Sequence, residues 1–270
     1  MRPAYRTSVA VLLLLAAVLL LGPWLSPWEQ EHIDWNAIDT PPSSVHWFGT
    51  DGSGRDLLVR TMAGGRVSLT VALLATIVSF AIGLPWGAIA GFAGGRIDQL
   101  MMRIVDGLYG LPFMFLVILL VVFFDRNNPY LLFIAIGAVS WLDLARIVRG
   151  QTLVVKNAMY IEAAKALGVS NLWIITRHVV PNVMGPALVY ATLTIPGVII
   201  AESFISFLGL GIQEPQTSWG VLIADGANRL HAPWQLIFPA TFLAVTLLVL
   251  NVAGDQLREA MEPKKQGVRL

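Results

Sequence analysis

The sequence predicts an all-α polytopic membrane protein with about six transmembrane helices. Of the 270 residues, 56% are hydrophobic and only 13% are charged, and the mean hydropathy is +0.69. Soluble domains carry about 25% charged residues. The second observation is a series of long stretches without Asp, Glu, Lys or Arg. A membrane-spanning helix needs about 20 apolar residues and a charge at its centre is costly, so these stretches are the candidate spans.

The candidate spans form one membrane domain, residues 1–270, without a clear internal repeat. The first follows Arg2 and Arg6 as a secretory signal would, but "LLGPWLSPW" contains no small-x-small cleavage site, so we expect a retained span. The fourth is expected to continue past Asp143, whose charge could pair with Arg146 one helical turn later. The predicted spans are residues 7–28, 67–95, 104–124, 129–149, 179–201 and 234–254.

The distribution of Lys and Arg predicts the orientation, because cytoplasmic loops carry an excess of these residues. With the N-terminus inside, 13 of the 18 Lys and Arg residues lie on the cytoplasmic side. Both termini are therefore predicted to be cytoplasmic. Residues 26–66 and 202–233 then lie outside the membrane, and residues 157–178 form a cytoplasmic loop.

The composition and the missing motifs exclude several classes of function. The formal net charge is +1 and no loop carries a concentrated basic block, so nucleic acid is not an expected partner. None of the four histidines belongs to an H-E-x-x-H pair, and no lysine follows a glycine as in a phosphate-binding loop. The chain has no cysteine and thus no thiolate. We expect a chain that is not an enzyme and has no cofactor or metal of its own.

Small residues and prolines mark two of the predicted spans. Gly83, Gly87 and Gly91 recur at four-residue spacing, which lets two backbones approach closely in lipid. That contact could form within this chain or with a partner subunit. In the fifth span, Pro186 and Pro196 lie in Gly-Pro and Pro-Gly pairs, which could be hinges for a gate. Prolines are, however, frequent in membrane helices in general.

Ionisable residues inside spans are candidates for function. Asp106, Asp143 and Glu202 lie within a few residues of a predicted span end, where water or a loop arginine could satisfy them. Glu202 could be paired structurally, or could contribute with Ser203 to an outer gate or substrate path. No chain of Asp, Glu or His crosses the predicted midplane, which argues against a self-sufficient ion-coupled pump.

The cytoplasmic loop contains "EAAKALGVSNLWIITRHVVPN", residues 162–182. We expect Asn157 to cap a first short helix and Gly168 to end it in the left-handed conformation. Ser170 or Asn171 then caps a second helix, and Pro181 marks the entrance to the fifth span.

The first of these short helices has an apolar face. A helix of about ten residues is marginal alone in water, so we expect it to pack, either against the membrane surface or against a partner. The residues on this face are Met159, Ala163, Ala166 and Leu167.

This loop resembles the EAA loop of ABC-importer permeases, whose pattern is E-A-A, three residues, G, nine residues, then I-x-L-P. Glu162, Ala163, Ala164, Gly168 and Pro181 match that pattern. At the two remaining positions the sequence has histidine and valine in place of isoleucine and leucine. The stretches "FGTDGSGRDLLVR", "AESFISFLGLGIQEPQTSWG" and "LNVAGDQLREAMEPK" resemble the C-type permease of dipeptide/oligopeptide importers, a group shared with nickel and glutathione uptake.

The resemblance implies a type I ABC-importer permease fold with a cytoplasmic coupling helix, in a bacterial inner membrane. It implies a homologous B-type permease, two ABC ATPase subunits that bind ATP and magnesium, and an extracytoplasmic substrate-binding protein that delivers the peptide. The alternatives are a secondary carrier or channel that works without ATPases, and a membrane scaffold without a transport role. The residues implied in ATPase coupling are Ala158, Tyr160, Glu162, Ala163, Ala164, Ala166, Leu167 and Gly168.

Overall fold

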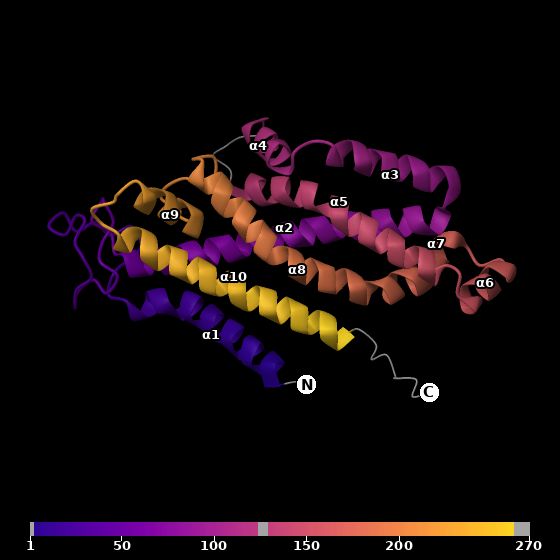
Figure 1. Cartoon of the computed structure of the whole chain (residues 1–270), viewed down its shortest axis with the longest axis horizontal. Coiled ribbons are helices and arrows are strands. Elements are labelled where there is room, and N and C mark those ends of the chain that lie inside the picture. Colours follow the sequence, from indigo (N-terminus) through magenta and orange to yellow (C-terminus); the bar gives the residue numbers. More distant parts are fainter. Residues whose placement is uncertain (1–2, 124–128, 262–270) are drawn as a thin grey trace, which may run out of the picture.

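The computed structural model describes residues 3–123 and 129–261. The regular secondary structure of these residues is helical, which confirms the all-α prediction. Long helices run along the long axis of the molecule (Figure 1). They are α1 (Pro3–Leu25), α2 (Leu57–Ala93), α5 (Pro129–Val155), α8 (Val180–Phe207) and α10 (Trp234–Met261).

The two ends of this bundle carry different elements. Residues 26–56 and α9 (Trp219–Ala227) lie at one end. Helices α6 (Met159–Ala166) and α7 (Asn171–Ile174) lie at the other, and the start of α1 and the end of α10 are directed toward that end (Figure 1). The predicted outer segments are thus opposite the predicted cytoplasmic loop. Which end faces the cytoplasm stays a prediction.

Helices α2 and α5 pack closely through the small residues of α2. A Cβ atom on Gly83 would lie 2.9 Å from the carbonyl oxygen of Trp141, and one on Gly91 would lie 2.8 Å from that of Arg149. The glycine spacing therefore serves a contact within the chain, the first of the two alternatives. The largest buried apolar cluster draws on α2, α5 and α8 and includes Val71, Ala72, Ala75, Ile136, Ala145, Val198 and Ile199.

The predicted span 104–124 is not one helix. It is divided between α3 (Gly95–Tyr109) and α4 (Phe113–Phe123), which are bent by 84° relative to each other. Pro112 explains the break, because a proline disfavours the helical conformation of the residue before it and has no backbone N–H to donate. This residue also makes a natural start for α4.

Two other helices extend beyond the predicted spans. Helix α2 begins at Leu57, ten residues before the second predicted span, where Asp56 caps it by accepting a hydrogen bond from the backbone N–H of Val59. The second loop helix continues into α8 through one π-helical turn, Ile175–Val179. Pro181 comes just after this turn and has no N–H with which to continue the regular hydrogen-bond ladder.

Length and apolarity mark three helical stretches of the described residues as able to cross a membrane: Leu57–Ala93, Asn171–Phe207 and Trp234–Glu259. The bent pair α3–α4 would be a fourth. The apolar part of α1, Ala10–Trp24, is shorter. The residues that precede α5 lie outside the described part. The count of six spans stays a prediction.

Candidate coupling surface and buried polar sites

Helix α6 is anchored to the bundle by one buried side chain. Ile161 is fully buried and belongs to an apolar cluster with Ile174 and Val179. Ala158 and Ala164, two predicted coupling residues, are partly buried and pack against the same cluster. Helix α6 is therefore packed against the end of the bundle.

The opposite side of α6 is exposed. Met159 and Tyr160 are exposed apolar side chains, and Leu167, just after α6, is 83% exposed. Leu172 and Trp173 of α7 extend this surface, which we call the coupling surface. The predicted coupling residues that are exposed are Tyr160, Glu162, Ala163, Ala166, Leu167 and Gly168.

The joint between α6 and α7 follows the predicted local chemistry, with one correction. Gly168 has a φ of +77°, which confirms the left-handed prediction. Ser170 caps α7 by accepting a hydrogen bond from the N–H of Trp173. Asn157 was expected to cap α6, which is wrong: its Nδ2 donates to the carbonyl oxygen of Leu153, 3.1 Å away, at the end of α5. The residue at the N-cap position of α6 is instead Ala158, which has no side-chain acceptor.

Glu202 lies where α2, α8 and α9 meet, and it is completely buried. Ser68 Oγ donates to its Oε2 at 3.0 Å, and Ser206 Oγ donates to its Oε1 at 2.7 Å. The backbone N–H of Trp219, at the start of α9, donates to Ser68 Oγ at 3.3 Å. Among the described residues, the polar partners of this carboxyl group are hydroxyl groups. Ser68 belongs to α2 and also accepts from α9, so these hydrogen bonds join α2, α8 and α9 at Glu202. Its neighbour Ser203 is partly buried.

The two candidate hinge prolines lie inside α8, which the structure describes as one helix from Val180 to Phe207. Pro186 is exposed and Pro196 is buried. Their role as hinges, like the role of Glu202 and Ser203 in a gate, stays a prediction.

The predicted pair of Asp143 and Arg146 is wrong. Arg146 Nη2 instead lies 2.7 Å from Asp106 Oδ1 on α3, and its guanidinium lies 4.1 Å from the centroid of the Tyr109 ring. The Tyr109 side chain lies next to Asp143. A second ion pair, between Arg149 and Asp98, also joins α5 to α3.

Asp143 also lies farther from the end of its helix than the sequence indicated. It is the fifteenth of the 27 residues of α5, because this helix continues to Val155. The spacing of Asp143, Arg146 and Arg149, one helical turn apart each time, was the signal for a charged stripe on this helix.

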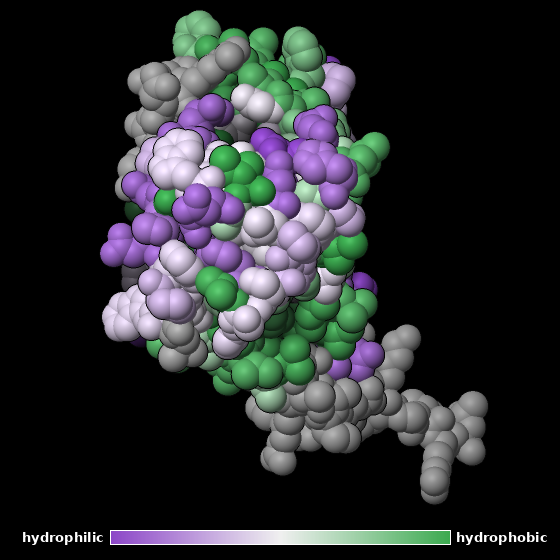
Figure 2. Space-filling model, turned by 90° about the vertical axis from the view of Figure 1, so that its left-hand side faces the viewer, coloured by the Kyte–Doolittle hydropathy of each residue, from purple (hydrophilic) through white to green (hydrophobic). Residues whose placement is uncertain are grey.

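At the other end, ion pairs tie the first outer segment to the second. The buried Arg60 donates from Nη1 to Asp51 Oδ2 at 2.8 Å. Arg55 donates to Asp51 at 2.8 Å and to Glu214 at 2.7 Å. The stretch "GTDGSGRD" contains a turn, with Gly54 at a φ of +79°. Figure 2 views this end of the molecule, where hydrophilic residues cover the centre and hydrophobic residues lie above and below.

Asp39 ties the first outer segment to the start of α10. Arg229 Nη1 lies 3.2 Å from both carboxylate oxygens, and Gln235 Nε2 donates to Oδ1 at 2.7 Å. His231 Nε2 lies 3.3 Å from Oδ2. Burial raises the pKa of Asp39, but the hydrogen bonds from Gln235 and His231 and the charge of Arg229 outweigh burial. The net pKa lies below its ordinary value of 3.8.

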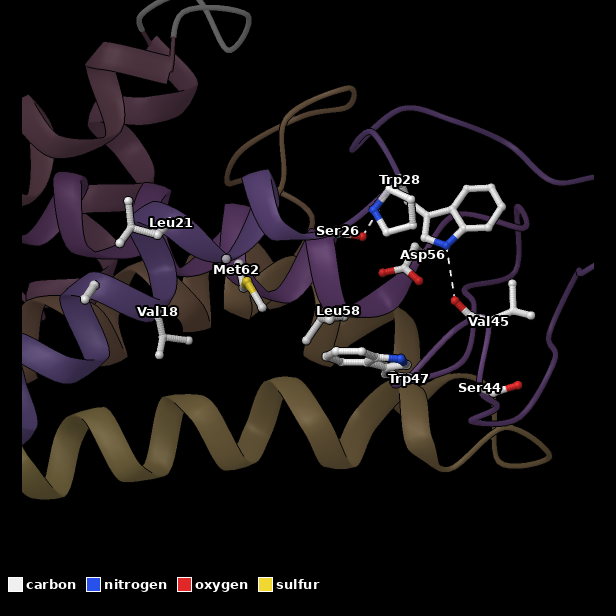
Figure 3. A pocket seen from close by; sticks show the side chains of 13 residues that line it. Val18, Leu21, Ser26, Trp28, Ser44, Val45, Trp47, Asp56, Leu58 and Met62 are labelled. Carbon is white, nitrogen blue, oxygen red and sulfur yellow. Dashed lines mark hydrogen bonds between the residues drawn. The ribbon is translucent and has the colours of Figure 1, made fainter.

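A cavity of about 480 Å³ lies between the end of α1, the first outer segment and the start of α2. Trp28 and Trp47 lie at its loop end, and Val18 and Leu21 lie on the α1 side (Figure 3). Trp28 is held by a hydrogen bond from its Nε1 to the carbonyl oxygen of Val45, 3.2 Å away. Its mostly apolar lining offers no cation to a carboxylate, so this cavity is a poor site for a charged solute.

Together these features define the class of protein: a polytopic helical membrane protein with a short helix, α6, that is packed against one end of the bundle and exposed on its other side. The family model described as "Binding-protein-dependent transport system inner membrane component" matches residues 83–267. The oligopeptide transport system permease protein OppC of Haemophilus influenzae is 52% identical over 265 residues, which is 96% of this chain and 85% of that protein. The dipeptide transport system permease protein DppC of Bacillus subtilis is 45% identical over 256 residues, covering 94% and 80%.

The chain therefore belongs to the family of binding-protein-dependent transport system inner membrane components. Among solved structures, an inward-facing form of the MetNI methionine ABC transporter has a similar fold, with a TM-score of 0.61 and 19% identity. That match covers 74% of this chain and 95% of the other. The predictions of an importer permease subunit and of a type I permease fold are confirmed, and the alternative of a carrier or channel acting alone is not supported.

Proposed function

We propose that this chain forms half of the membrane path of a peptide importer. It would pair with a homologous B-type permease and receive dipeptides or oligopeptides from an extracytoplasmic binding protein. The relatives named above are oligopeptide and dipeptide permeases, and they match this chain over almost its whole length, which supports a peptide as the cargo.

The observation that carries the coupling part of this proposal is the two-sided character of α6. Its inner side is fixed to the bundle through Ile161, and its outer side presents Met159 and Leu167 to solvent. Exposed apolar patches on a polar end of a protein mark interaction sites. We infer that two ABC ATPase subunits, which bind ATP and magnesium, engage the coupling surface here and in the second permease. Their closure would then move the helices to which α6 is fixed.

The orientation in the membrane is part of the same proposal. We infer an inner-membrane location with both termini and α6 in the cytoplasm, because the Lys and Arg residues favour that side. The end that carries residues 26–56 and α9 would then face the binding protein.

The test compares two variants in which an exposed leucine is replaced by aspartate, one at each end of the molecule. Leu167→Asp places a charge on the coupling surface, where the leucine is 83% exposed, and Leu230→Asp does so at the other end, where the leucine is 87% exposed. Each is assembled with its partner subunits and binding protein in proteoliposomes. We expect Leu167→Asp to lose co-purification of the ATPase and ATP-driven peptide uptake. Leu230→Asp should retain the ATPase.

If Leu167→Asp retains the ATPase and imports peptide as the wild type does, the coupling assignment fails. Liposomes that contain this chain alone form the second arm. Gradient-driven peptide uptake in them would contradict the requirement for ATPase partners.

A further inference from the structure

The break between α3 and α4 lies open to the surroundings of the chain. All residues from 106 to 113 are exposed, although they interrupt a stretch that is apolar enough to span a membrane. Non-helical backbone at membrane depth is tolerated only where it is buried in protein or lines a water-filled cavity. This chain does not bury the break, so lipid cannot be what covers it.

Charged side chains gather beside the break. The ion pair of Asp106 with Arg146 is open to the surroundings, since the two side chains are 63% and 38% exposed. Tyr109 lies under the Arg146 guanidinium and next to Asp143. Such charges are expensive in contact with hydrocarbon, and intramembrane ionisable residues face a bundle interior or a water-filled cavity. The open side of this mid-span cluster (Asp106, Tyr109, Asp143, Arg146) therefore faces water or a polar surface.

The mid-span cluster lies about halfway along the bundle. Helix α5 has 27 residues and is about 40 Å long, and Asp143 is close to its middle. Tyr190, on the facing helix, is the twentieth residue of the 37-residue stretch Asn171–Phe207, and its electrostatic neighbours are Asp143 and Tyr109. The cluster is thus about as far from one end of these helices as from the other.

A polar cavity continues from the mid-span cluster toward the start of α3. Its volume is about 750 Å³, within the usual range of small-molecule sites. It adds a second and a third guanidinium, Arg103 and Arg149, to the cluster. The residues that line it are Gln99, Met102, Arg103, Asp106, Gly107 and Arg149.

We propose that the mid-span cluster and the break beside it line the substrate path and contact the charged termini of the passing peptide. This inference rests on the proposed peptide-import function and names the residues of that path. The Asp106 and Asp143 carboxylates fit an ammonium group, and the planar guanidinium of Arg146 fits a carboxylate in a bidentate manner. Arg146 is already paired with Asp106. The carboxylate of a peptide can therefore replace Asp106 on Arg146, and Asp106 can later displace that carboxylate. The peptide is thus released again, as passage through the membrane requires.

The absence of cysteine from the chain makes a labelling test direct. Gly107→Cys places a thiol beside Asp106, where an added Cβ atom meets nothing within 4 Å. The matched control is Leu248→Cys, at an exposed apolar position of α10. Each variant is assembled with its partner subunits in proteoliposomes, checked for peptide uptake, and treated with a charged methanethiosulfonate reagent with and without nucleotide, binding protein and peptide.

We expect Gly107→Cys to react with the charged reagent in at least one nucleotide state, and the peptide to slow this reaction several-fold. Leu248→Cys should react only with a lipid-soluble maleimide. If Gly107→Cys never reacts while the complex imports peptide, a polar face of the partner permease covers the cluster. The inference is then wrong, but the proposed function stands. Reaction without protection by peptide likewise overturns the contact with cargo.

A second variant tests the chemistry of the contact. Arg146→Gln should lower the uptake of peptides per ATP hydrolysed, and Arg146→Lys should restore part of it, because a cation is retained without the planar geometry. Equal uptake by Arg146→Gln and the wild type would overturn the role of Arg146. A wild-type complex that hydrolyses ATP but imports no peptide would contradict the proposed function itself, whatever the labelling shows.

Discussion

At the scale of single residues, Ile161 connects the coupling surface to the membrane helices. It is the buried residue of the eight-residue α6, and it packs with residues of α7, the π-helical turn and α8. A short helix has little stability of its own, so its position depends on such a tertiary contact. The pattern of the EAA loop draws attention to Glu162 and the alanines, whereas the anchor is the residue just before them.

We predict that Ile161→Ala uncouples ATP hydrolysis from uptake without removing the coupling surface. The substitution leaves a cavity and costs about 2–5 kcal/mol of local stability. The ATPase should still co-purify, but the amount of peptide imported per ATP hydrolysed in proteoliposomes should fall. Met159→Ala, on the exposed side of the same helix, should instead weaken ATPase binding. An Ile161→Ala complex with normal coupling would show that α6 needs no such anchor.

Glu202 gives a second prediction at this scale. Glu202→Gln keeps an acceptor for the serine hydroxyls, whereas Glu202→Ala leaves Ser68 and Ser206 without their buried partner. A buried polar group left unsatisfied costs about 1–3 kcal/mol, and the lost volume adds to that. We expect thermal unfolding in detergent to show a clearly lower midpoint for Glu202→Ala and a small change for Glu202→Gln. Equal midpoints for the two variants would exclude a fastening role.

At the scale of elements, the end that carries residues 26–56 and α9 depends on ties between segments far apart in the sequence. Asp39 joins the first outer segment to Arg229 and to Gln235 of α10, and Asp51 joins Arg60 of α2 to the same region. These ties rest on charged groups, so they respond to pH. The coupling end, by contrast, is held mainly by apolar contacts of Ile161 and Ile174.

Asp39 gives a prediction with a defined direction in pH. Its pKa in the folded protein lies below 3.8, so its ionised form stabilises the fold above that pH, and this contribution is lost as the pH falls through the lowered pKa. Asp39→Asn is a suitable comparison, because Asp39 has a φ of +50°, which asparagine also tolerates. The thermal midpoint of the wild type should exceed that of Asp39→Asn near neutral pH, and the difference should shrink below pH 3.8. A difference that stays constant across this range would contradict the role of the charge.

At the scale of the whole molecule, the orientation in the membrane determines which cysteine variants an impermeant reagent can reach. We predict that Asn228→Cys, at the end that carries α9, reacts with an impermeant maleimide in right-side-out vesicles. Met159→Cys, on α6, should react only in inside-out vesicles. Both positions are exposed in the chain, and vesicles without the ATPase subunits leave Met159 uncovered, so burial does not limit either reaction. The reverse pattern would invert the predicted topology and place α6 outside the cytoplasm.

The sequence by itself determined the features that depend on local chemistry. Long apolar stretches require helices in a bilayer, Gly168 suits a positive φ, and Ser170 suits the start of a helix. The spacing of the EAA loop indicated the family that the comparisons then established. Each of these signals lies within a few turns of one segment, so it can be recognised without knowing what that segment packs against.

Only the tertiary structure decided which partners those segments meet. Arg146 pairs with Asp106, 40 residues away, and not with Asp143 one turn before it. The anchoring side of α6 and the serine hydroxyls around Glu202 likewise come from contacts between distant helices. Burial and ion pairing depend on distances in space, and a linear sequence does not contain these distances until the chain has packed.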